Sequence, residues 1–416
     1  MAEKKAFTSS QSKAIAHSGS DLLISAGAGS GKTATLTERI IRKIIDGADI
    51  SRMLVVTFTK EAANELKSRI TARLVSALKD APDNRHLQAQ IVKMSSAKIS
   101  TIHSFCLSVI RPNFDKIGID NDFRVGEENE IETLMKESMN EVIDFFYENE
   151  PENSDFLTVC DCYSQLSSED KLADELLSLY NKLSSTSLFL DSLIKDTDFD
   201  GDFMLTPYGK VLTTELSQFV YHYAPIYKKI IDDIRAVDGT PKYLNAFVSD
   251  FEYLTRIDES LKSPTYQGLK EIFDSYTPLP LNGIKDSEID TVFAKAVREK
   301  FKKTLVEKYK GSYFSAKSES IEASLIQNNK ICASMHKILT LFNEEFSKKK
   351  RSEGVCDFND IERFAHKLLL EKNGEPSSLA RELSLELDEI YVDEYQDTNS
   401  VQNDIFAAIS RNNRFM

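Results

Sequence analysis

The glycine-rich segment ISAGAGSGKTATL, residues 24–36, has the residue types of a loop that binds phosphate. Small residues let successive backbone N–H groups point inward, and the start of a following helix presents partial positive charge to an anion. Lys32 is expected to reach the β- and γ-phosphates of a bound nucleotide, and the Thr33 hydroxyl to bind Mg²⁺. The backbone expected to surround the phosphates belongs to Ala26, Gly27, Ala28, Gly29, Ser30 and Gly31. Because Ala26 stands where the usual pattern has its first glycine, the alternative is a turn that precedes Lys-Thr by chance.

Two adjacent acids, Asp393 and Glu394, follow the apolar run in LDEIYVDEYQD, 361 positions after Lys32. The run predicts a buried strand that ends in carboxylates. At that strand end Asp393 is expected to hold Mg²⁺, and Glu394 to accept a proton from the attacking water. An acidic surface loop is the alternative, but it would leave the phosphate loop in the same chain unexplained. The two segments together predict hydrolysis of a nucleotide.

The elements that must position these residues alternate between apolar runs and helical patterns. Strands are expected at 21–26 (DLLISA) and 53–58 (MLVVTF), with helices at 32–46 and 60–77. Apolar runs rich in Val, Ile and Leu that alternate with helices are typical of a parallel sheet covered on both faces. The sequence therefore predicts an α/β fold with a nucleotide-binding core.

Long amphipathic helical stretches, such as EENEIETLMKESMNEVIDFFYENE, replace this pattern between residues 113 and 353. We interpret this region as a large, mostly helical domain inserted into the core, whose two parts are 1–112 and 354–416. The final segment ISRNNRFM has the pattern of a new strand, so the core is expected to be truncated there. The basic run KKKR, 348–351, fits a solvated helix end and a contact with the DNA backbone equally well.

Charge is unevenly distributed along this acidic chain, whose net charge is -14. Residues 1–111 carry 17 Lys and Arg against 9 Asp and Glu, which favours a local site for a polyanion within an otherwise acidic protein. No apolar run approaches the roughly 18 residues that cross a bilayer, so we expect no membrane span. The five cysteines have no paired metal-ligand spacing and are expected to be free, buried thiols of a cytoplasmic protein.

Four segments in sequence order carry a family resemblance: AGAGSGKT, VVTFTKEAANELKSRI, STIHSFC and VDEYQDTN. They resemble motifs I, Ia, Ib and II of superfamily 1 DNA helicases of the UvrD/Rep/RecB type. FRVGEENE, EYQDTN and FNDIERFAHKLL resemble more closely the AddA (RexA) subunits of AddAB helicase-nucleases. The motifs that carry the resemblance lie within 7–126 and 355–408. Between these ranges the similarity is mainly in the layout of the chain. It implies a RecA-like P-loop NTPase core.

The resemblance also implies roles for single residues. Gln11 matches the glutamine that recognises adenine. A side-chain amide suits this task because it can both donate hydrogen bonds to the adenine edge and accept them from it. Gln396 matches the residue that senses the γ-phosphate and couples hydrolysis to movement. UvrD-like members have an arginine after the loop threonine, whereas this chain has Ala34, which favours the AddA-like branch.

Contacts with single-stranded DNA are implied at two of the motifs. Bases stack on aromatic side chains and backbone groups hold phosphates, which suits residues at strand ends. The four positions that match are Phe58, Thr59, Thr101 and His103. Without the resemblance, Phe58 would be interpreted as core and His103 as structural.

The implied function is an ATP-dependent DNA helicase motor that processes double-strand DNA ends for recombinational repair. The implied partners are single- and double-stranded DNA ends and an AddB-like nuclease subunit. Motif III, a second RecA-like domain and the nuclease domain of the family are not in this sequence, so little activity is expected from this piece alone. Three alternatives stay open: a UvrD-like repair helicase without nuclease, a nucleotide-dependent switch without turnover, and a P-loop kinase, which would not need the second and third motifs.

Overall fold

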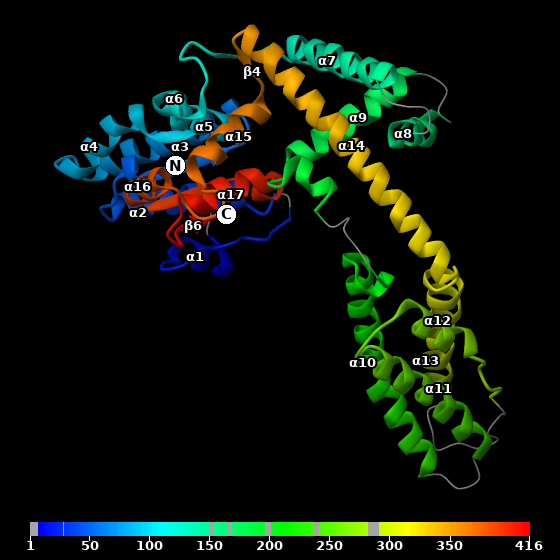
Figure 1. Ribbon diagram of the computed structural model, residues 1–416. Coiled ribbons are helices and arrows are strands. Elements are labelled where there is room, and N and C mark those ends of the chain that lie inside the picture. Colours follow the sequence, from blue (N-terminus) through cyan, green and yellow to red (C-terminus); the bar gives the residue numbers. More distant parts are fainter. Residues whose placement is uncertain are drawn as a thin grey trace. The chain divides into compact units, whose positions relative to one another are not determined.

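The computed structural model describes residues 7–27, 29–149, 154–164, 169–195, 201–236, 241–281 and 291–416. These residues belong to two compact units (Figure 1). The sheet unit comprises Met1–Asn149, Leu166–Leu190 and Ile338–Met416, and the helical unit comprises Glu150–Gln165 and Asp191–Lys337. The compact helical unit is thus smaller than the region 113–353 that the sequence pattern suggests. The reason is that the parts of this region at 113–149, 166–190 and 338–353 belong to the sheet unit.

The sheet unit is built on four parallel strands in the order β2-β1-β5-β6. Their bounds are β1 Met53–Thr57, β2 Lys98–Thr101, β5 Glu389–Val392 and β6 Arg414–Phe415. In register, Val56 lies opposite Val392 and Thr57 opposite Thr101. Because the strands are parallel, their carboxyl ends share one edge of the sheet, where ligands of open α/β sheets bind.

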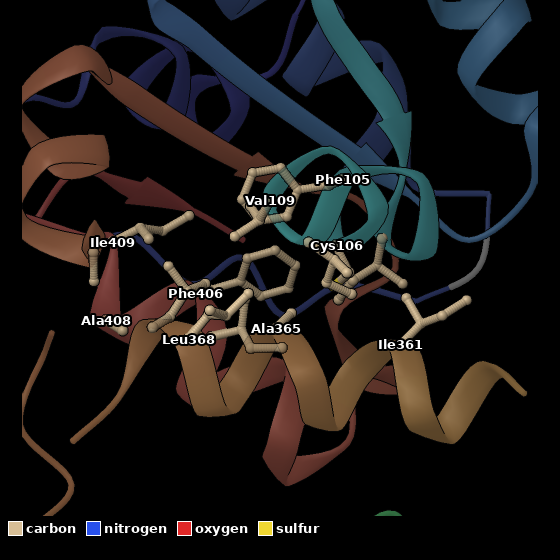
Figure 2. Close-up of a cluster of buried hydrophobic side chains, with 14 of the residues drawn as sticks. Phe105, Cys106, Val109, Ile361, Ala365, Leu368, Phe406, Ala408 and Ile409 are labelled. Carbon is tan, nitrogen blue, oxygen red and sulfur yellow. The ribbon is translucent and has the colours of Figure 1, made fainter. Parts of the chain in front are cut away.

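One face of this sheet is covered by α5 (Ile102–Ile110), α15 (Phe358–Leu369) and α17 (Ser400–Ala408). Leu54, Val56, Ile390 and Val392 project into this side, as the two-residue period of a strand requires. Figure 2 shows side chains of this core from α5, α15 and α17, together with Ile409, the residue that follows α17. Those labelled are Phe105, Cys106, Val109, Ile361, Ala365, Leu368, Phe406, Ala408 and Ile409.

The opposite face carries α2 (Lys32–Ile45), α3 (Lys60–Asp80) and α4 (Arg85–Lys93). The alternate strand residues Met53, Val55 and Tyr391 pack here against Leu36 and Ile40 of α2, among others. Helices on both faces of a parallel sheet confirm the α/β class expected from the sequence.

The segment 21–26 differs from its expected strand. Only Leu22 forms a bridge, with Phe415 of β6, and its neighbour Ile24 donates from its backbone N–H to the Met416 carbonyl at 2.8 Å. The segment pairs along residues 414–416 alone, so it remains an extended stretch beside the sheet. It nevertheless leads directly into the glycine-rich loop.

A second, two-stranded parallel sheet joins distant parts of the sheet unit, β3 (Arg124–Val125) and β4 (Val355–Cys356). The chain between them leaves the core and returns to within one strand spacing of where it left. The remaining helices of this unit are α1 (Ser9–Ala16), α6 (Phe114–Ile117), α7 (Glu128–Asn149), α9 (Glu169–Ser184), α16 (Ser378–Glu386) and the last part of α14 (Ser318–Ser352).

The helical unit has its own aromatic-rich core. Inside it, Arg298 donates from Nε to Asp250 Oδ2 at 2.6 Å, and the Tyr276 hydroxyl donates to Oδ1 of the same carboxylate at 3.0 Å. Its helices are α8 (Asp155–Ser164), α10 (Pro207–Arg235), α11 (Pro241–Ser260), α12 (Tyr266–Ser275), α13 (Thr291–Lys303), the π-helix Thr304–Tyr313 and the first part of α14.

All five cysteines are free, as expected, but burial is confirmed only for Cys106, Cys160 and Cys356, since Cys332 is half-buried and Cys162 is exposed. None of the helices in the described residues is long and apolar enough to span a membrane.

Arg39 of α2 links three elements around the loop. Its Nη1 donates to the carbonyl oxygens of Ala14, Ile15 and His17 at the end of α1, at 3.1, 3.0 and 2.6 Å. Its Nη2 donates to Glu389 Oε1 of β5 at 2.8 Å, and the Arg39 side chain is only 4% exposed. Burial alone would raise the pKa of Glu389, but bonds from Lys43, Tyr391 and Arg39 hold it below its ordinary value.

Replacing Arg39 should therefore loosen α1 and β5 together. We predict that Arg39→Met lowers the free energy of unfolding of the sheet unit by about 1.5–3 kcal/mol, because Glu389 loses one of its two charged partners and the carbonyl groups at the end of α1 lose a charged donor. Urea unfolding combined with hydrogen exchange of α1 and β5 amides measures this loss. Arg42→Met is the matched control: this side chain is 49% exposed in a surface pair with Glu38, so the expected change is below about 1 kcal/mol. Equal effects of the two substitutions would contradict the prediction.

Candidate functional site

The glycine-rich loop ends at Gly31, which precedes α2 in a left-handed backbone conformation with φ of 87°. Gly29 is also left-handed, with φ of 74°. A Cβ on Gly31 would lie 3.1 Å from the Gln11 amide nitrogen, so both the backbone and the space favour glycine. Among the described residues no side chain caps α2, which leaves its first N–H groups directed at the loop. Ala28 lies outside the described residues.

Lys32 begins α2, and its ammonium group turns back into the loop. Nζ donates to the Ala26 carbonyl at 2.8 Å and to the Gly27 carbonyl at 3.5 Å. An ammonium has three N–H groups, so one remains to donate to an anion held in the same loop.

The loop and the acidic pair meet through Thr33 and Asp393. The Thr33 hydroxyl donates to the Asp393 carboxylate, at 3.2 Å to Oδ2 and 3.5 Å to Oδ1, across 360 positions of sequence. The Asp393 backbone N–H donates to the Val56 carbonyl at 3.0 Å, which fixes the acid beside the end of β1. Burial, followed by the charge of Glu394, raises the pKa of Asp393 above its ordinary value.

In many nucleotide sites the protein contributes only a hydroxyl and a carboxylate as Mg²⁺ ligands, and phosphate and water supply the others. In the described part of the chain no group of three or more His, Cys, Asp or Glu side chains could hold a metal without such help. The donors at Thr33 and Asp393 thus fit a Mg²⁺ ion that arrives with a nucleotide.

Glu394 adopts a left-handed backbone conformation, with φ of 54°. Such a conformation costs a residue with a side chain on the order of 1–3 kcal/mol and recurs at functional sites. It turns the chain from β5 into the short helix η7 (Tyr395–Asp397), in which the Gln396 amide donates to the Glu394 carboxylate. The acidic pair is therefore part of a strained turn, unlike an ordinary surface loop.

A cavity of about 820 Å³ unites these parts. Its lining includes Gly29 to Ala34 and Leu36 on the loop side and Val392 to Gln396 on the acidic side. A hollow of about 920 Å³ elsewhere in the sheet unit, between α7, α9 and the start of α15, contains none of the predicted catalytic residues. The smaller cavity is the one that matches the chemistry.

Gln11 lies next to the loop, on the first turn of α1. Its side-chain carbonyl accepts from the Thr8 backbone N–H at 2.9 Å, and its amide donates to the Ser30 carbonyl at 2.9 Å. Both ends of the amide therefore contact the protein, and one of these contacts belongs to the phosphate loop.

The residues of the second and third motifs lie at the ends of β1 and β2, on the same edge of the sheet. Phe58 is 39% exposed there. Thr59 caps α3 by accepting from the Ala62 N–H at 3.0 Å, and Thr101 caps α5 by accepting from the Ser104 N–H at 3.3 Å. Thr101 is buried, so its hydroxyl has a structural role in the chain itself.

His103 has two neighbours that the sequence did not single out. Its ring lies 4.6 Å from the ring of Phe358, which is 56% exposed, and its Nε2 lies 3.0 Å from Oε1 of the buried Glu362. Glu362 interrupts the apolar stripe of α15 that includes Ile361 and Ala365, and an acid within such a stripe was the available signal.

The basic run 348–351 is largely engaged in ion pairs. Lys350 is buried and contacts Asp357 at 2.7 Å and Asp360 at 2.6 Å, and Lys349 contacts Glu141 at 2.8 Å. Lys350 therefore anchors the end of α14 to the start of α15.

Comparison with known proteins identifies the family. The family model described as UvrD/REP helicase N-terminal domain matches residues 7–416. The chain belongs to the UvrD/REP helicase family. The resemblance of the four motifs is thereby confirmed.

Similar curated proteins are named as the A subunits of ATP-dependent helicase/nucleases. One from Acetivibrio thermocellus is 33% identical over 99% of this chain and 34% of its own length. Those from Staphylococcus aureus and Clostridium kluyveri are 33% and 34% identical over 97% and 98% of the chain, and over 33% and 34% of their own lengths. The chain thus spans about a third of the length of these relatives.

The pKa of Asp393 predicts a pH dependence. Mg²⁺ binds the carboxylate form, and this pKa lies above the ordinary value of 3.8, so Mg²⁺-dependent nucleotide binding should weaken at a higher pH than for an ordinary aspartate as the solution is acidified. Calorimetric titration of nucleotide with and without Mg²⁺, from neutral to mildly acidic pH, measures this. Asp393→Asn is the control that retains only the titration of the nucleotide. An identical pH profile in both proteins would contradict the assignment.

Lys32 supplies the second prediction for this site. Loss of a charge-assisted hydrogen bond to phosphate costs about 1.5–3 kcal/mol, so Lys32→Ala should weaken nucleotide binding by about 10- to 150-fold or abolish it. Fluorescence titration with a labelled ATP analogue tests this on the chain of 416 residues. Lys79→Ala, at the exposed end of α3, is the control and should bind normally.

Proposed function

We propose that this chain is the ATP-binding front part of a DNA helicase motor. In this proposal 1–112 and 354–416 form a RecA-like P-loop core that is incomplete without a second such domain. The region 113–353 is its largely helical insertion. The return of the chain from β3 to β4 supports an insertion, because the two strands that flank it pair with each other.

The contact between Thr33 and Asp393 is the observation on which the proposal rests. A phosphate loop alone fits many nucleotide-binding proteins, whereas a loop joined to a strand-end acid pair has the groups needed for hydrolysis. The family membership adds that such a site serves helicases.

Each residue of the site has its own proposed role. The loop backbone from Ala26 to Gly31 and the Lys32 ammonium would bind the β- and γ-phosphates of ATP, and Gln11 would recognise adenine. Thr33 and Asp393 would hold Mg²⁺, which when bound neutralises phosphate charge.

Glu394 would orient the attacking water and accept its proton. Gln396 already donates to Glu394, so in its proposed role as γ-phosphate sensor it would exchange this partner for the phosphate. This exchange would link the state of the nucleotide to the acid that activates water.

DNA contact is proposed at Phe58, Thr59, Thr101 and His103, on the edge of the sheet that also carries Asp393. Phe58 is exposed enough to stack on a base. Thr59 and Thr101 would act by capping α3 and α5, whose N-terminal N–H groups suit phosphate.

For the whole protein we propose ATP-driven translocation on DNA that processes double-strand ends for recombinational repair. The relatives are named as A subunits of helicase/nucleases, which supports a nuclease function and a second subunit, for which an AddB-like partner is our proposal. The expected cytoplasmic location suits a DNA substrate. A switch without turnover is the rival, and the strained Glu394 turn favours hydrolysis over it.

The test compares ATPase rates with and without single-stranded DNA. We expect strong stimulation by DNA only in a chain extended through the second RecA-like domain, because that domain supplies the charge that stabilises the transition state. In the extended chain Glu394→Gln should bind nucleotide normally and lose hydrolysis by at least about 100-fold.

Two outcomes would reject the proposal. Comparable turnover in the shorter chain, indifferent to DNA, would mean that the site is complete without the second domain. Equal loss of nucleotide binding in Glu394→Gln and Lys32→Ala would mean that the roles of the two residues are wrongly divided.

A further inference from the structure

Glu362 joins three helices through one buried carboxylate. It projects from α15, and it is 4% exposed. Its Oε1 lies 3.0 Å from His103 Nε2 of α5 and accepts from Gln402 Nε2 of α17 at 2.6 Å, while its Oε2 accepts from Asn399 Nδ2 at 2.9 Å. A buried carboxylate is stable only with such partners. Although burial alone would raise its pKa, the bonds from His103, Asn399 and Gln402 hold it below its ordinary value, so Glu362 is charged.

The partners of Glu362 on α17 are themselves fixed. Asn399 and Gln402 form a capping box, in which Asn399 Oδ1 accepts from the Gln402 N–H at 2.8 Å and Gln402 Oε1 accepts from the Asn399 N–H at 3.4 Å. The carbonyl end of each amide serves the helix and the nitrogen end serves Glu362. The position of the Glu362 carboxylate therefore sets the position of the start of α17.

The start of α17 is joined directly to the hydrolytic residues. Asn399 is three positions after Gln396 and five after Glu394. A second contact ties the same parts, because the Tyr395 hydroxyl of η7 donates to Asn403 Oδ1 of α17 at 2.6 Å. A displacement of the start of α17 is thus transmitted to both residues.

The other end of the network reaches the surface. His103 is about one-third exposed on its side chain, and its ring lies against the exposed ring of Phe358. A ligand that contacts this pair would reorient the imidazole, and the carboxylate in direct contact with that imidazole is Glu362.

We propose that Glu362 is a positioning residue that couples occupancy of the His103–Phe358 surface by single-stranded DNA to the placement of Glu394 and Gln396. The inference rests on the proposed function. Under this inference Glu362 is needed for DNA to stimulate ATP hydrolysis. It is not needed for the binding of ATP or of DNA.

Two substitutions break the network without removing a ligand contact. Glu362→Gln replaces one acceptor oxygen by an NH₂ group, which then faces the donors of Asn399 or Gln402. Asn399→Ser keeps a good helix cap and removes only the donor to Glu362. Glu382→Gln, an exposed acid on the neighbouring α16, is the matched control.

The experiment uses the complete protein, with its partner protein present and oligo(dT) as the DNA. For Glu362→Gln and Asn399→Ser we expect at least about a tenfold loss of maximal DNA stimulation of ATP hydrolysis. The KM for ATP, the ATPase rate without DNA and the oligo(dT) affinity by fluorescence anisotropy should stay within about threefold of wild type. The double variant should lose no more than the single ones, because residues of one network are not additive.

Unchanged stimulation in both variants would overturn the inference. So would an equal loss of the DNA-free and DNA-stimulated rates, because this is the signature of a residue that only holds the fold, and Asn399→Ser gives this answer even if Glu362→Gln does not fold. Absence of DNA stimulation in the wild-type protein would instead reject the proposed function. The two failures are therefore distinguishable.

Discussion

The parallel pairing of β1 with β5 is the constraint on which the candidate site depends. It sets Val56 opposite Val392, so the chain that leaves β5 must emerge beside the ends of β1 and β2. Asp393 then donates its N–H to Val56 and receives the Thr33 hydroxyl, although Thr33 lies 360 positions away. A shift of one residue in this register would turn Val392 to the other face of the sheet and remove Asp393 from the loop. The two clusters of apolar side chains oppose such a shift, because each accepts only alternate residues of the strands.

Buried charged side chains also help to hold the helices around the sheet. They act where apolar packing alone would not fix the orientation of a helix. Arg39 ties α1 and β5 to the helix that follows the loop, and Glu362 ties α5, α15 and α17. A buried charge is costly unless every partner is in place, so each network tolerates few arrangements. The apolar clusters thus supply the bulk of the stability, while the charged networks specify how the helices that carry Gln11 and Asn399 are oriented.

Sequence reasoning succeeded where the chemistry is local. The spacing of Gly29, Gly31 and Lys32 indicated the loop, and the apolar run before Asp393 indicated its strand, because both patterns are set by neighbouring residues. It failed where pairing is distant: 21–26 forms only a bridge at Leu22, since its hydrogen bonds depend on residues 414–416. Glu362 was missed for the same reason, because its partners lie on two other helices. The bounds of the helical unit also depend on how long helices pack, which composition does not reveal.

The side chains proposed to bind ATP and Mg²⁺ share one property. Each is already hydrogen-bonded either to the glycine-rich loop or to one of the two acids, Asp393 and Glu394. Lys32 donates to Ala26, Gln11 to Ser30, Thr33 to Asp393 and Gln396 to Glu394. These hydrogen bonds hold the side chains close to where a ligand would need them. Binding then exchanges one hydrogen bond for another and requires little reordering of side chains. Because the exchanged partners belong to the loop and to the turn after β5, a nucleotide bound as proposed would alter both segments together, and this is the property that a nucleotide-driven motor requires.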